Sequence, residues 1–354
     1  MRALVLDAPA ELARDLQLRC NESSDLKLMI AGRHNPLVAN QGDAIFQSFC
    51  SRCKLDLSAI RALRRTILQF RPDVLHSFQP RSLAQAVLAT TGLRQPPKIL
   101  SFYGITRVPS WREPADWITY LSPKIALHAC ESNAVKRALM EGGVKESKCE
   151  VIYNCVEKIA HPKSRAEVLA QFNIPVDSFV VGTVATVRPI KGIDILLKAL
   201  IECSDIPNLV TVIAGSVHDP RVSQLSQDPR IRNRIRWLGY VDQAASIMPG
   251  MDLFAMPSRK EGLCRALLEA MGQAVCPVVS DAGGMKELVR NNRDGIVFSS
   301  EDHLGLASAI RKLHSSPQLR DRYALSALGQ VTTYCAPNVV GGRVVGMFER
   351  ALAA

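Results

Sequence analysis

Two glutamates in the stretch RKEGLCRALLEA, residues 259–270, are the most informative candidates for chemistry in this sequence. Glu261 comes directly before Gly262, and Glu269 follows eight positions after Glu261, in a segment with helical apolar spacing. A helix rises about 1.5 Å per residue, so this spacing corresponds to about 12 Å. Two charges facing water on a surface helix are the ordinary explanation, since charged residues are mostly exposed. The surrounding sequence must decide between that explanation and a site.

Three loops in the same part of the chain each follow an apolar strand pattern and open a helical one. They are residues 188–192, 259–262 and 283–284, and they bring glycines and two basic pairs to one predicted sheet edge. Helix N-termini offer N–H groups to anions, and glycine allows a phosphate to approach the backbone. Lys191 and Arg188 add full positive charges. The loops therefore predict a site for a phosphorylated ligand.

The spacing of the two glutamates indicates what kind of phosphorylated ligand the site would bind. About 12 Å is comparable to the span from a sugar ring to a ribose across a diphosphate. Glu261 would then contact the sugar, and Glu269 would accept hydrogen bonds from the ribose hydroxyls. The N–H groups of Leu263 and Cys264 would lie between them, against the phosphates. The predicted ligand is a sugar nucleotide.

Short apolar strands alternate with longer helical patterns along most of the chain, which is typical of parallel βαβ units. The pattern is interrupted over residues 157–178, where two prolines and a short helix replace the strands. We therefore predict an α/β fold of two Rossmann-like domains facing a cleft. The expected boundaries are 1–160, 161–335 and a C-terminal helix, 336–354, that returns to the first domain.

Composition narrows the class of protein. The chain has 354 residues, 47% of them hydrophobic, and no run of about 18 apolar residues that could span a bilayer. The opening MRALVLDAPAEL is read as a strand, not an export signal, so the ten cysteines are expected to be reduced in a cytoplasm. Cys50 and Cys53 form an isolated CxxC, for which no second ligand pair follows.

The net charge of +11 predicts an anionic partner: a phosphorylated substrate, a membrane surface or nucleic acid. No zinc-finger spacing, basic heptad or RNA-binding aromatic motif is present, so nucleic acid is not expected. The stretch RALRRTILQFR, residues 61–71, reads either as a solvated helix face or as a basic amphipathic helix touching anionic lipid. The net charge favours contact with anionic lipid. The protein is then expected in the cytoplasm, at the inner face of the membrane.

These motifs together resemble glycosyltransferase family 4, of GT-B architecture. The resemblance rests on VGTVATVRPIKGIDILLKAL, RWLGYVD, EGLCRALLEAM and PVVSDAGGMKELV, which occur in the family's order, and on CEVIYNCVE at the end of the first domain. It covers most of residues 150–300 and is weaker before residue 120. It implies a retaining transferase that moves a hexose-type sugar from a nucleotide diphosphate to an acceptor.

The resemblance also implies roles for single residues. Glu261 would sit by the donor sugar as a positioning and electrostatic residue, Glu269 would hold the ribose, and Lys191, followed by Gly192, would bind the phosphates. The family usually has an arginine where this chain has Thr186, and we expect Arg188 to replace it. The base would be read by backbone groups near Gly239–Val241. No D-x-D motif occurs, so neither a metal nor another cofactor is expected.

The first domain departs from the family's pattern. The loop after the first strand reads DAPAELARD without glycine, and Tyr103 precedes Gly104 where relatives often have a histidine. Tyr103 is read either as a donor-sugar contact or as a core tyrosine at a strand end. His76 is read either as a substrate contact after a strand or as a structural histidine. Both would belong to the acceptor side.

The function predicted from sequence is transfer from a nucleotide-diphosphate sugar, with UDP favoured, to a glycan or lipid-linked acceptor. Bacterial lipopolysaccharide or exopolysaccharide synthesis is the expected setting. A GT-B sugar-nucleotide epimerase is an alternative, but no acid–base residues stand out in the first domain. A non-catalytic two-domain sugar-binding protein is another, although such proteins are commonly exported. A nucleic-acid binder would leave the two glutamates unexplained.

Overall fold

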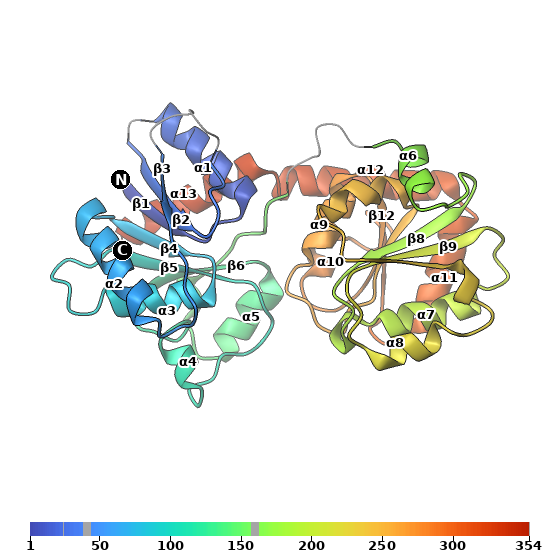
Figure 1. The fold of residues 1–354 in the computed structure, drawn as a ribbon, viewed down its shortest axis with the longest axis horizontal. Coiled ribbons are helices and arrows are strands. Elements are labelled where there is room, and N and C mark those ends of the chain that lie inside the picture. The colour runs from blue at the N-terminus through green and yellow to red at the C-terminus, as the bar shows by residue number, and fades with distance from the viewer. Residues whose placement is uncertain (24, 38–43, 157–162, 354) are drawn as a thin grey trace. The chain divides into compact units, whose positions relative to one another are not determined.

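The computed structural model describes residues 1–354 except 24, 38–43, 157–162 and 354. The chain divides into two compact units, each a parallel sheet flanked by helices (Figure 1). The N-terminal unit comprises Met1–Cys155 and Ala336–Ala354, and the C-terminal unit comprises Val156–Cys335. The class is therefore α/β with two Rossmann-like units. The boundary expected between residues 160 and 161 falls outside the described residues, and the division comes after Cys155.

Among the described residues, the N-terminal unit contains a seven-stranded sheet in the order β3-β2-β1-β4-β5-β6-β7. All its strand pairs are parallel. The strands are β1 (Arg2–Leu6), β2 (Lys27–Gly32), β3 (Ile45–Ser48), β4 (Val74–Ser77), β5 (Lys98–Tyr103), β6 (Ile125–Cys130) and β7 (Cys149–Val151). The strand order reverses direction between β1 and β4, which makes this pair a topological switch point.

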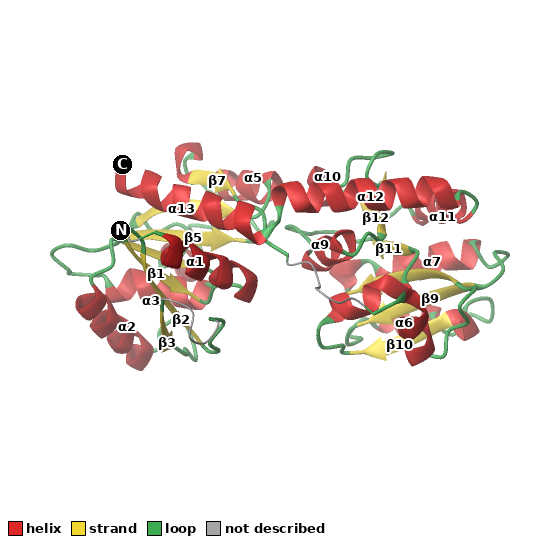
Figure 2. Cartoon of the chain, turned by 90° about the horizontal axis from the view of Figure 1, so that it is seen from above, coloured by secondary structure: helices red, strands yellow, loops and turns green. Residues whose placement is uncertain are grey.

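Helices cover both faces of this sheet. They are α1 (Ala10–Glu22), α2 (Leu57–Phe70), α3 (Pro80–Ala89), α4 (Pro114–Trp117), α5 (Asn133–Glu141), the 3-10 helix η1 (Glu146–Lys148) and α13 (Pro337–Ala353). Asp56 begins α2 by accepting hydrogen bonds from the backbone N–H groups of Ser58 and Ala59. The C-terminal helix α13 lies beside α1 (Figure 2) and buries Val344 and Phe348 in the core of this unit.

The described part of the C-terminal unit contains a six-stranded parallel sheet in the order β10-β9-β8-β11-β12-β13. Its strands are β8 (Phe179–Val184), β9 (Leu209–Ala214), β10 (Ile235–Gly239), β11 (Leu253–Met256), β12 (Cys276–Ser280) and β13 (Ile296–Phe298). The helices are α6 (Arg165–Gln171), α7 (Ile193–Glu202), α8 (Pro220–Leu225), α9 (Arg265–Gly272), α10 (Met285–Leu288), α11 (His303–His314) and α12 (Pro317–Tyr334), with 3-10 helices η2 (Pro189–Lys191), η3 (Arg232–Arg234) and η4 (Ala244–Gly250).

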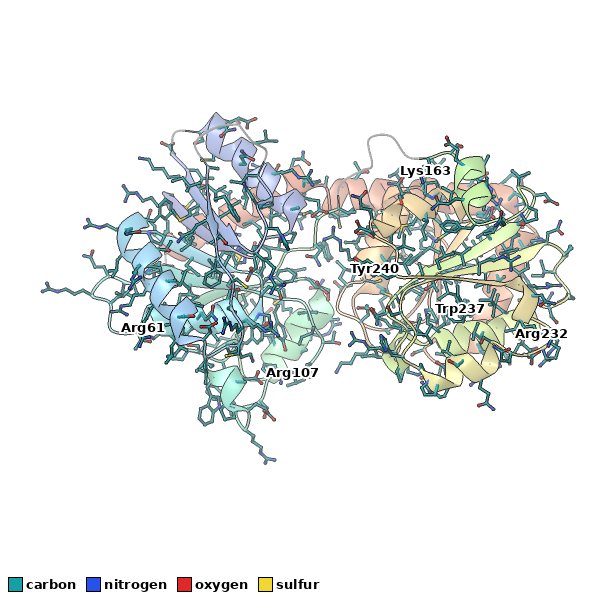
Figure 3. The ribbon with its side chains drawn as sticks, in the orientation of Figure 1. Arg61, Arg107, Lys163, Arg232, Trp237 and Tyr240 are labelled. Carbon is teal, nitrogen blue, oxygen red and sulfur yellow. The ribbon has the colours of Figure 1, made fainter. Side chains whose placement is uncertain are left out.

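The basic helix around residues 61–71 corresponds to α2, and its apolar stripe is not free. Leu63 and Ile67 are buried in the core of the N-terminal unit, and Arg64 donates hydrogen bonds to backbone carbonyls at the end of α3 and just beyond it. Arg61 (Figure 3) and Arg65 remain exposed. The exposed surface of α2 therefore combines these arginines with Leu57 and Leu68, which are 63% and 54% exposed. Within the described residues, no helix is both long enough and apolar enough to cross a membrane.

His76 corrects one reading of the sequence, in which it follows a strand and faces a ligand. It lies inside β4 and is completely buried, with its ring against Phe78 and Phe348 at centroid distances of 4.4 and 5.8 Å. Neither ring nitrogen has a hydrogen-bond partner among the described residues. Burial lowers the pKa of His76 to about 3. The histidine is neutral and structural.

The depressed pKa of His76 predicts a pH-dependent loss of stability. The unfolded chain binds a proton near pH 6.5 and the folded chain only near pH 3, so stability falls as the pH drops below 6.5. At pH 5 the loss from this residue is about 2 kcal/mol. We expect His76→Leu to remove that part of the difference in unfolding free energy between pH 7 and pH 5. Urea unfolding at both pH values measures it, and an unchanged difference would contradict the assignment.

Candidate functional site

The strand order of the C-terminal unit reverses between β8 and β11, and ligands in such sheets bind beyond the carboxyl ends of the strands at this point. The two loops that leave these strands are residues 185–192 and 257–264. They carry Lys191 and Glu261, which the sequence singled out. Residues 70 positions apart are therefore placed side by side by the topology of the sheet.

Lys191 and Glu261 form an ion pair with 2.6 Å between Nζ and Oε2. The hydroxyl of Ser258 donates a hydrogen bond of 3.2 Å to the same carboxylate oxygen. The lysine and glutamate side chains are 25% and 14% exposed, so the pair is shielded yet reachable from solvent. Burial alone would lower the pKa of Lys191, but the adjacent Glu261 carboxylate raises it above its ordinary value. Lys191 is a fixed cation at neutral pH.

Two glycines allow the site loops to pack backbone against backbone. Gly192 has φ of +66°, and a Cβ there would lie 1.9 Å from the carbonyl oxygen of Pro257. Gly283, in the loop after β12, has φ of +60°, and a Cβ there would lie 1.7 Å from the carbonyl oxygen of Glu261. The N–H of Gly284 also donates to the carbonyl of Gly262, at 2.9 Å. The three loops meet only because these positions lack side chains.

Arg259 holds the same loops together through ion pairs, so its guanidinium is not available for a ligand. Its guanidinium makes two hydrogen bonds to the carboxylate of Asp194, at 2.7 and 2.8 Å, and a further ion pair with Glu301. These carboxylates raise the pKa of Arg259, with the Asp194 hydrogen bonds as the largest cause. The sequence placed Arg259 at this sheet edge without giving it a role, and the structure shows that it holds the loops together through these carboxylates. Asp194 and Glu301 were missed because their distance in sequence gives no local signal.

The helix that carries Glu269 begins later than the sequence predicted. α9 starts at Arg265, so Gly262, Leu263 and Cys264 are buried loop residues before it. The estimate of about 12 Å of continuous helix between the two glutamates is therefore wrong. The Glu269 carboxylate accepts a hydrogen bond from Nε of Arg265 at 2.9 Å and is 17% exposed. Burial raises the pKa of the Cys264 thiol to about 12.

Arg188 stands directly before η2 and is exposed. Its side chain has no hydrogen bond or ion pair with any described residue, and its positive charge acts to lower the pKa of Lys191. Two cations thus lie within electrostatic range of each other, and only Lys191 has a carboxylate partner. This uncompensated charge favours an anion beside the loop 185–192. Thr186, on the same loop, is also exposed.

The segment Gly239–Val241 adjoins these loops through a further glycine. Gly215, after β9, donates its N–H to the carbonyl of Gly239 at 2.6 Å, and a Cβ on Gly215 would lie 1.9 Å from the carbonyl oxygen of Ala185. Between Gly239 and Val241 stands Tyr240 (Figure 3), which is 80% exposed. Sequence reasoning missed Tyr240. Its only signal was an aromatic residue just beyond a strand end.

The residues expected in the first domain are placed differently. Tyr103 ends β5, is completely buried, and donates its hydroxyl to the carbonyl of Arg107. Burial raises the pKa of Tyr103 to about 12. A Cβ on Gly104 would lie 2.9 Å from a carboxylate oxygen of Glu131, which accepts a hydrogen bond of 2.7 Å from Asn154. The structure therefore corrects the reading of Tyr103 as a sugar contact and makes it a core residue.

Comparison with known proteins identifies the class. Residues 164–327 match the family model for glycosyl transferases group 1, and residues 29–158 match that for glycosyltransferase family 4. The chain therefore belongs to the group 1, family 4 glycosyltransferases.

Two curated relatives and one solved structure extend this finding. The lipopolysaccharide core biosynthesis glycosyltransferase LpsD of Rhizobium meliloti is 23% identical over 314 residues, covering 88% of this chain and 85% of LpsD. The UDP-Gal:alpha-D-GlcNAc-diphosphoundecaprenol alpha-1,3-galactosyltransferase of Escherichia coli is 24% identical over 310 residues, covering 82% and 80%. The crystal structure of Anabaena HepE in complex with UDP superposes with a TM-score of 0.79 at 19% identity, covering 99% and 100%. The fold is that of the GT-B glycosyltransferases.

The backbone packing of the loops gives a test of how the site is held. Gly283→Ala would place its Cβ on the carbonyl of Glu261, which adds overpacking to the cost of positive φ. We expect a loss of about 3 kcal/mol or more in unfolding free energy. Gly92→Ala is the matched control, because Gly92 has φ of +74° and nothing within 4 Å of the added Cβ. Its cost should stay near 1 kcal/mol. Equal losses in denaturant unfolding would show that the loop contact does not matter.

Proposed function

We propose that this enzyme transfers a hexose-type sugar from UDP to a glycan or glycolipid acceptor, with retention of anomeric configuration. The proposed setting is synthesis of a bacterial lipopolysaccharide or exopolysaccharide. The observation that carries the proposal is the Lys191–Glu261 pair beside the unpaired Arg188, at the switch point of the sheet. The relatives support it, since LpsD is named for lipopolysaccharide core synthesis and the E. coli relative for a UDP-galactose donor.

In this proposal the diphosphate lies over the loop 185–192. Breaking the bond between the sugar's anomeric carbon and the phosphate oxygen leaves negative charge on the diphosphate. Lys191 and Arg188 stabilise that charge, which is greater in the transition state than in the bound substrate. Glu261, held by Lys191 and Ser258, faces the sugar and accepts hydrogen bonds from its hydroxyls. We propose that these side chains suffice without a metal ion.

Retention requires the new bond to form on the face from which the old one breaks. We propose that the acceptor hydroxyl attacks the anomeric carbon on that face while the departing phosphate oxygen takes its proton. The acceptor oxygen then carries the sugar, and UDP leaves with the proton. In this step no protein group acts as a nucleophile, so the role of Glu261 is to position the sugar and stabilise its positive character.

The remaining donor contacts follow from the same placement. We propose that Glu269 accepts hydrogen bonds from the ribose hydroxyls after leaving its contact with Arg265. Gly239 and Val241 offer backbone groups to the uracil, and the exposed ring of Tyr240 offers it a face for stacking. Gly262, Leu263 and Cys264 line the diphosphate from the side of α9. The N-terminal unit is proposed to bind the acceptor.

Donor binding can be tested by thermal unfolding with UDP, GDP, ADP and their common sugar conjugates. A ligand at about one hundred times its dissociation constant should stabilise the folded protein by about 2.7 kcal/mol. We expect stabilisation by uridine nucleotides, in EDTA as well as without it. Lys191→Ala removes a charge-assisted contact and should weaken binding by about tenfold to one hundredfold, and Glu269→Ala should also weaken it.

Lys260→Ala is the matched control, because Lys260 is exposed on the loop of Glu261 and makes no ion pair with a described residue. It should keep the stabilisation by uridine nucleotides. If no nucleotide stabilises a folded sample, or if Lys191→Ala binds as well as the unmodified protein, the proposed donor site is wrong. Product analysis by NMR then decides between retention and inversion for a donor that binds.

We also propose that the exposed arginines of α2 bring the N-terminal unit to anionic lipid. Each basic residue near such a surface contributes about 1 kcal/mol of binding. Reversing two charges with Arg61→Glu and Arg65→Glu should weaken binding to phosphatidylglycerol-containing vesicles by about tenfold or more. Arg112→Glu with Arg137→Glu, two exposed positions of the same unit outside α2, is the charge-matched control. Co-sedimentation measures the binding, and equal losses for both variants would point to net charge alone.

A further inference from the structure

A pocket lies within the N-terminal unit, at the carboxyl edge of its sheet. It has a volume of about 560 Å³, within the range of small-molecule sites. Four neighbouring strands contribute to it through the segments that follow them. The lining residues are Asp7 after β1, Arg33 after β2, Phe49, Cys50, Ser51 and Lys54 after β3, and Gln79, Pro80 and Arg81 after β4.

This position is the topological counterpart of the site in the C-terminal unit. The strand order β3-β2-β1-β4 reverses between β1 and β4, so the loops leaving these two strands diverge and leave a crevice. The N–H of Asp7 donates to the carbonyl of Ala31 at 2.9 Å, and the N–H of Phe49 donates to the carbonyl of Gly32 at 2.9 Å. These bonds continue the strand pairing beyond the sheet edge, so the pocket has a defined backbone rim.

The pocket has more positive than negative charge. Arg33, Lys54 and Arg81 line it, and none of the three forms an ion pair with a described residue. Among the described residues, Arg33 donates a hydrogen bond only to the sulfur of Cys50, at 3.7 Å. By contrast, Arg107 in the same unit is held by the buried carboxylate of Asp116. Three unpaired cations around one pocket favour an anionic ligand.

Asp7 adds an acceptor for hydroxyl groups to this basic rim. Burial raises the pKa of its carboxyl, which interacts electrostatically with Ser82 and Arg33. A carboxylate beside several cations would repel a bare anion that approached it. It would suit a ligand that places hydroxyl groups at Asp7 and its negative group at the cations. The combination describes an acidic sugar better than an inorganic ion.

We infer that this pocket binds an acceptor sugar that carries a carboxylate or a phosphate, with Arg33, Lys54 and Arg81 around the anionic group and Asp7 at a hydroxyl. The role of this sugar as an acceptor rests on the proposed transferase function. Binding of an acidic sugar in the pocket does not depend on that function. Arg33 and Arg81 are specificity-determining residues in this assignment. A neutral sugar would leave the cations unpaired and bind more weakly.

The exposed thiol of Cys50 allows the pocket to be probed without any donor or turnover. Of the ten cysteines, all within the described residues, only Cys50 and Cys53 are exposed, and only Cys50 lines the pocket. In a Cys53→Ala background, intact-mass spectrometry follows the alkylation of Cys50 by iodoacetamide. The probes are glucuronate, glucose 6-phosphate, methyl glucoside and inorganic phosphate, at one millimolar-range concentration.

We expect glucuronate or glucose 6-phosphate to slow alkylation by about tenfold relative to methyl glucoside, the size of one charge-assisted contact. Which of the two protects tells a carboxylate from a phosphate. Arg33→Ala with Arg81→Ala should abolish the protection, whereas Arg137→Ala should retain it.

Four outcomes would overturn the inference: no protection by either acidic sugar, equal protection by methyl glucoside, protection that survives the double variant, or equal protection by inorganic phosphate. Failure of the transferase proposal is recognised separately. It would appear as absent nucleotide binding in the C-terminal unit, whereas Cys50 protection needs no nucleotide. A protein that passes only the Cys50 experiment would have the acidic-sugar pocket without the proposed activity.

Discussion

The close backbone contact of three loops is the constraint on which the C-terminal site depends. Gly192 against Pro257 and Gly283 against Glu261 leave no room for a Cβ, so the loops after β8, β11 and β12 meet at van der Waals distance. That contact puts Lys191 next to Glu261. Arg259 also connects the loops through its ion pair with Asp194, whose carboxylate is buried. Main-chain packing and the Arg259–Asp194 ion pair therefore hold the loops of the site together. The side chains proposed to bind the ligand remain partly exposed to solvent.

The excess positive charge is distributed in two distinct ways. Some arginines, such as Arg259 and Arg107, are held by buried carboxylates and serve the fold. Others, such as Arg188 and Arg33, have no carboxylate partner among the described residues and lie at carboxyl edges of the sheets. A net charge of +11 does not distinguish these groups, because a charge count contains no partners. Arg188 and Arg33 are therefore free to bind an anionic ligand, whereas Arg259 and Arg107 are not.

The failures of sequence interpretation have a common physical origin. In a parallel sheet covered on both faces, inward and outward positions are not marked by alternation, so the sequence left His76 and Tyr103 open between a ligand contact and a core position, and the structure buries both. The start of α9 was misplaced because Gly262 resembles a helix-opening residue, whereas its loop is fixed by contacts with the Gly283 turn. The contacts of Arg259 with Asp194 and Glu301 were not foreseen, because these carboxylates lie far from it in sequence.

The sequence by itself determined the α/β class, the succession of strands and helices, and the family, since these follow from local periodicity and from motifs in a fixed order. It also singled out Lys191 and Glu261 by residue type at strand ends. Only the tertiary structure decided which cations are free, which polar residues are buried, and that four strand ends of the N-terminal unit share one basic pocket. Those properties depend on groups far apart in the chain, and long-range pairing has no counterpart in local sequence pattern.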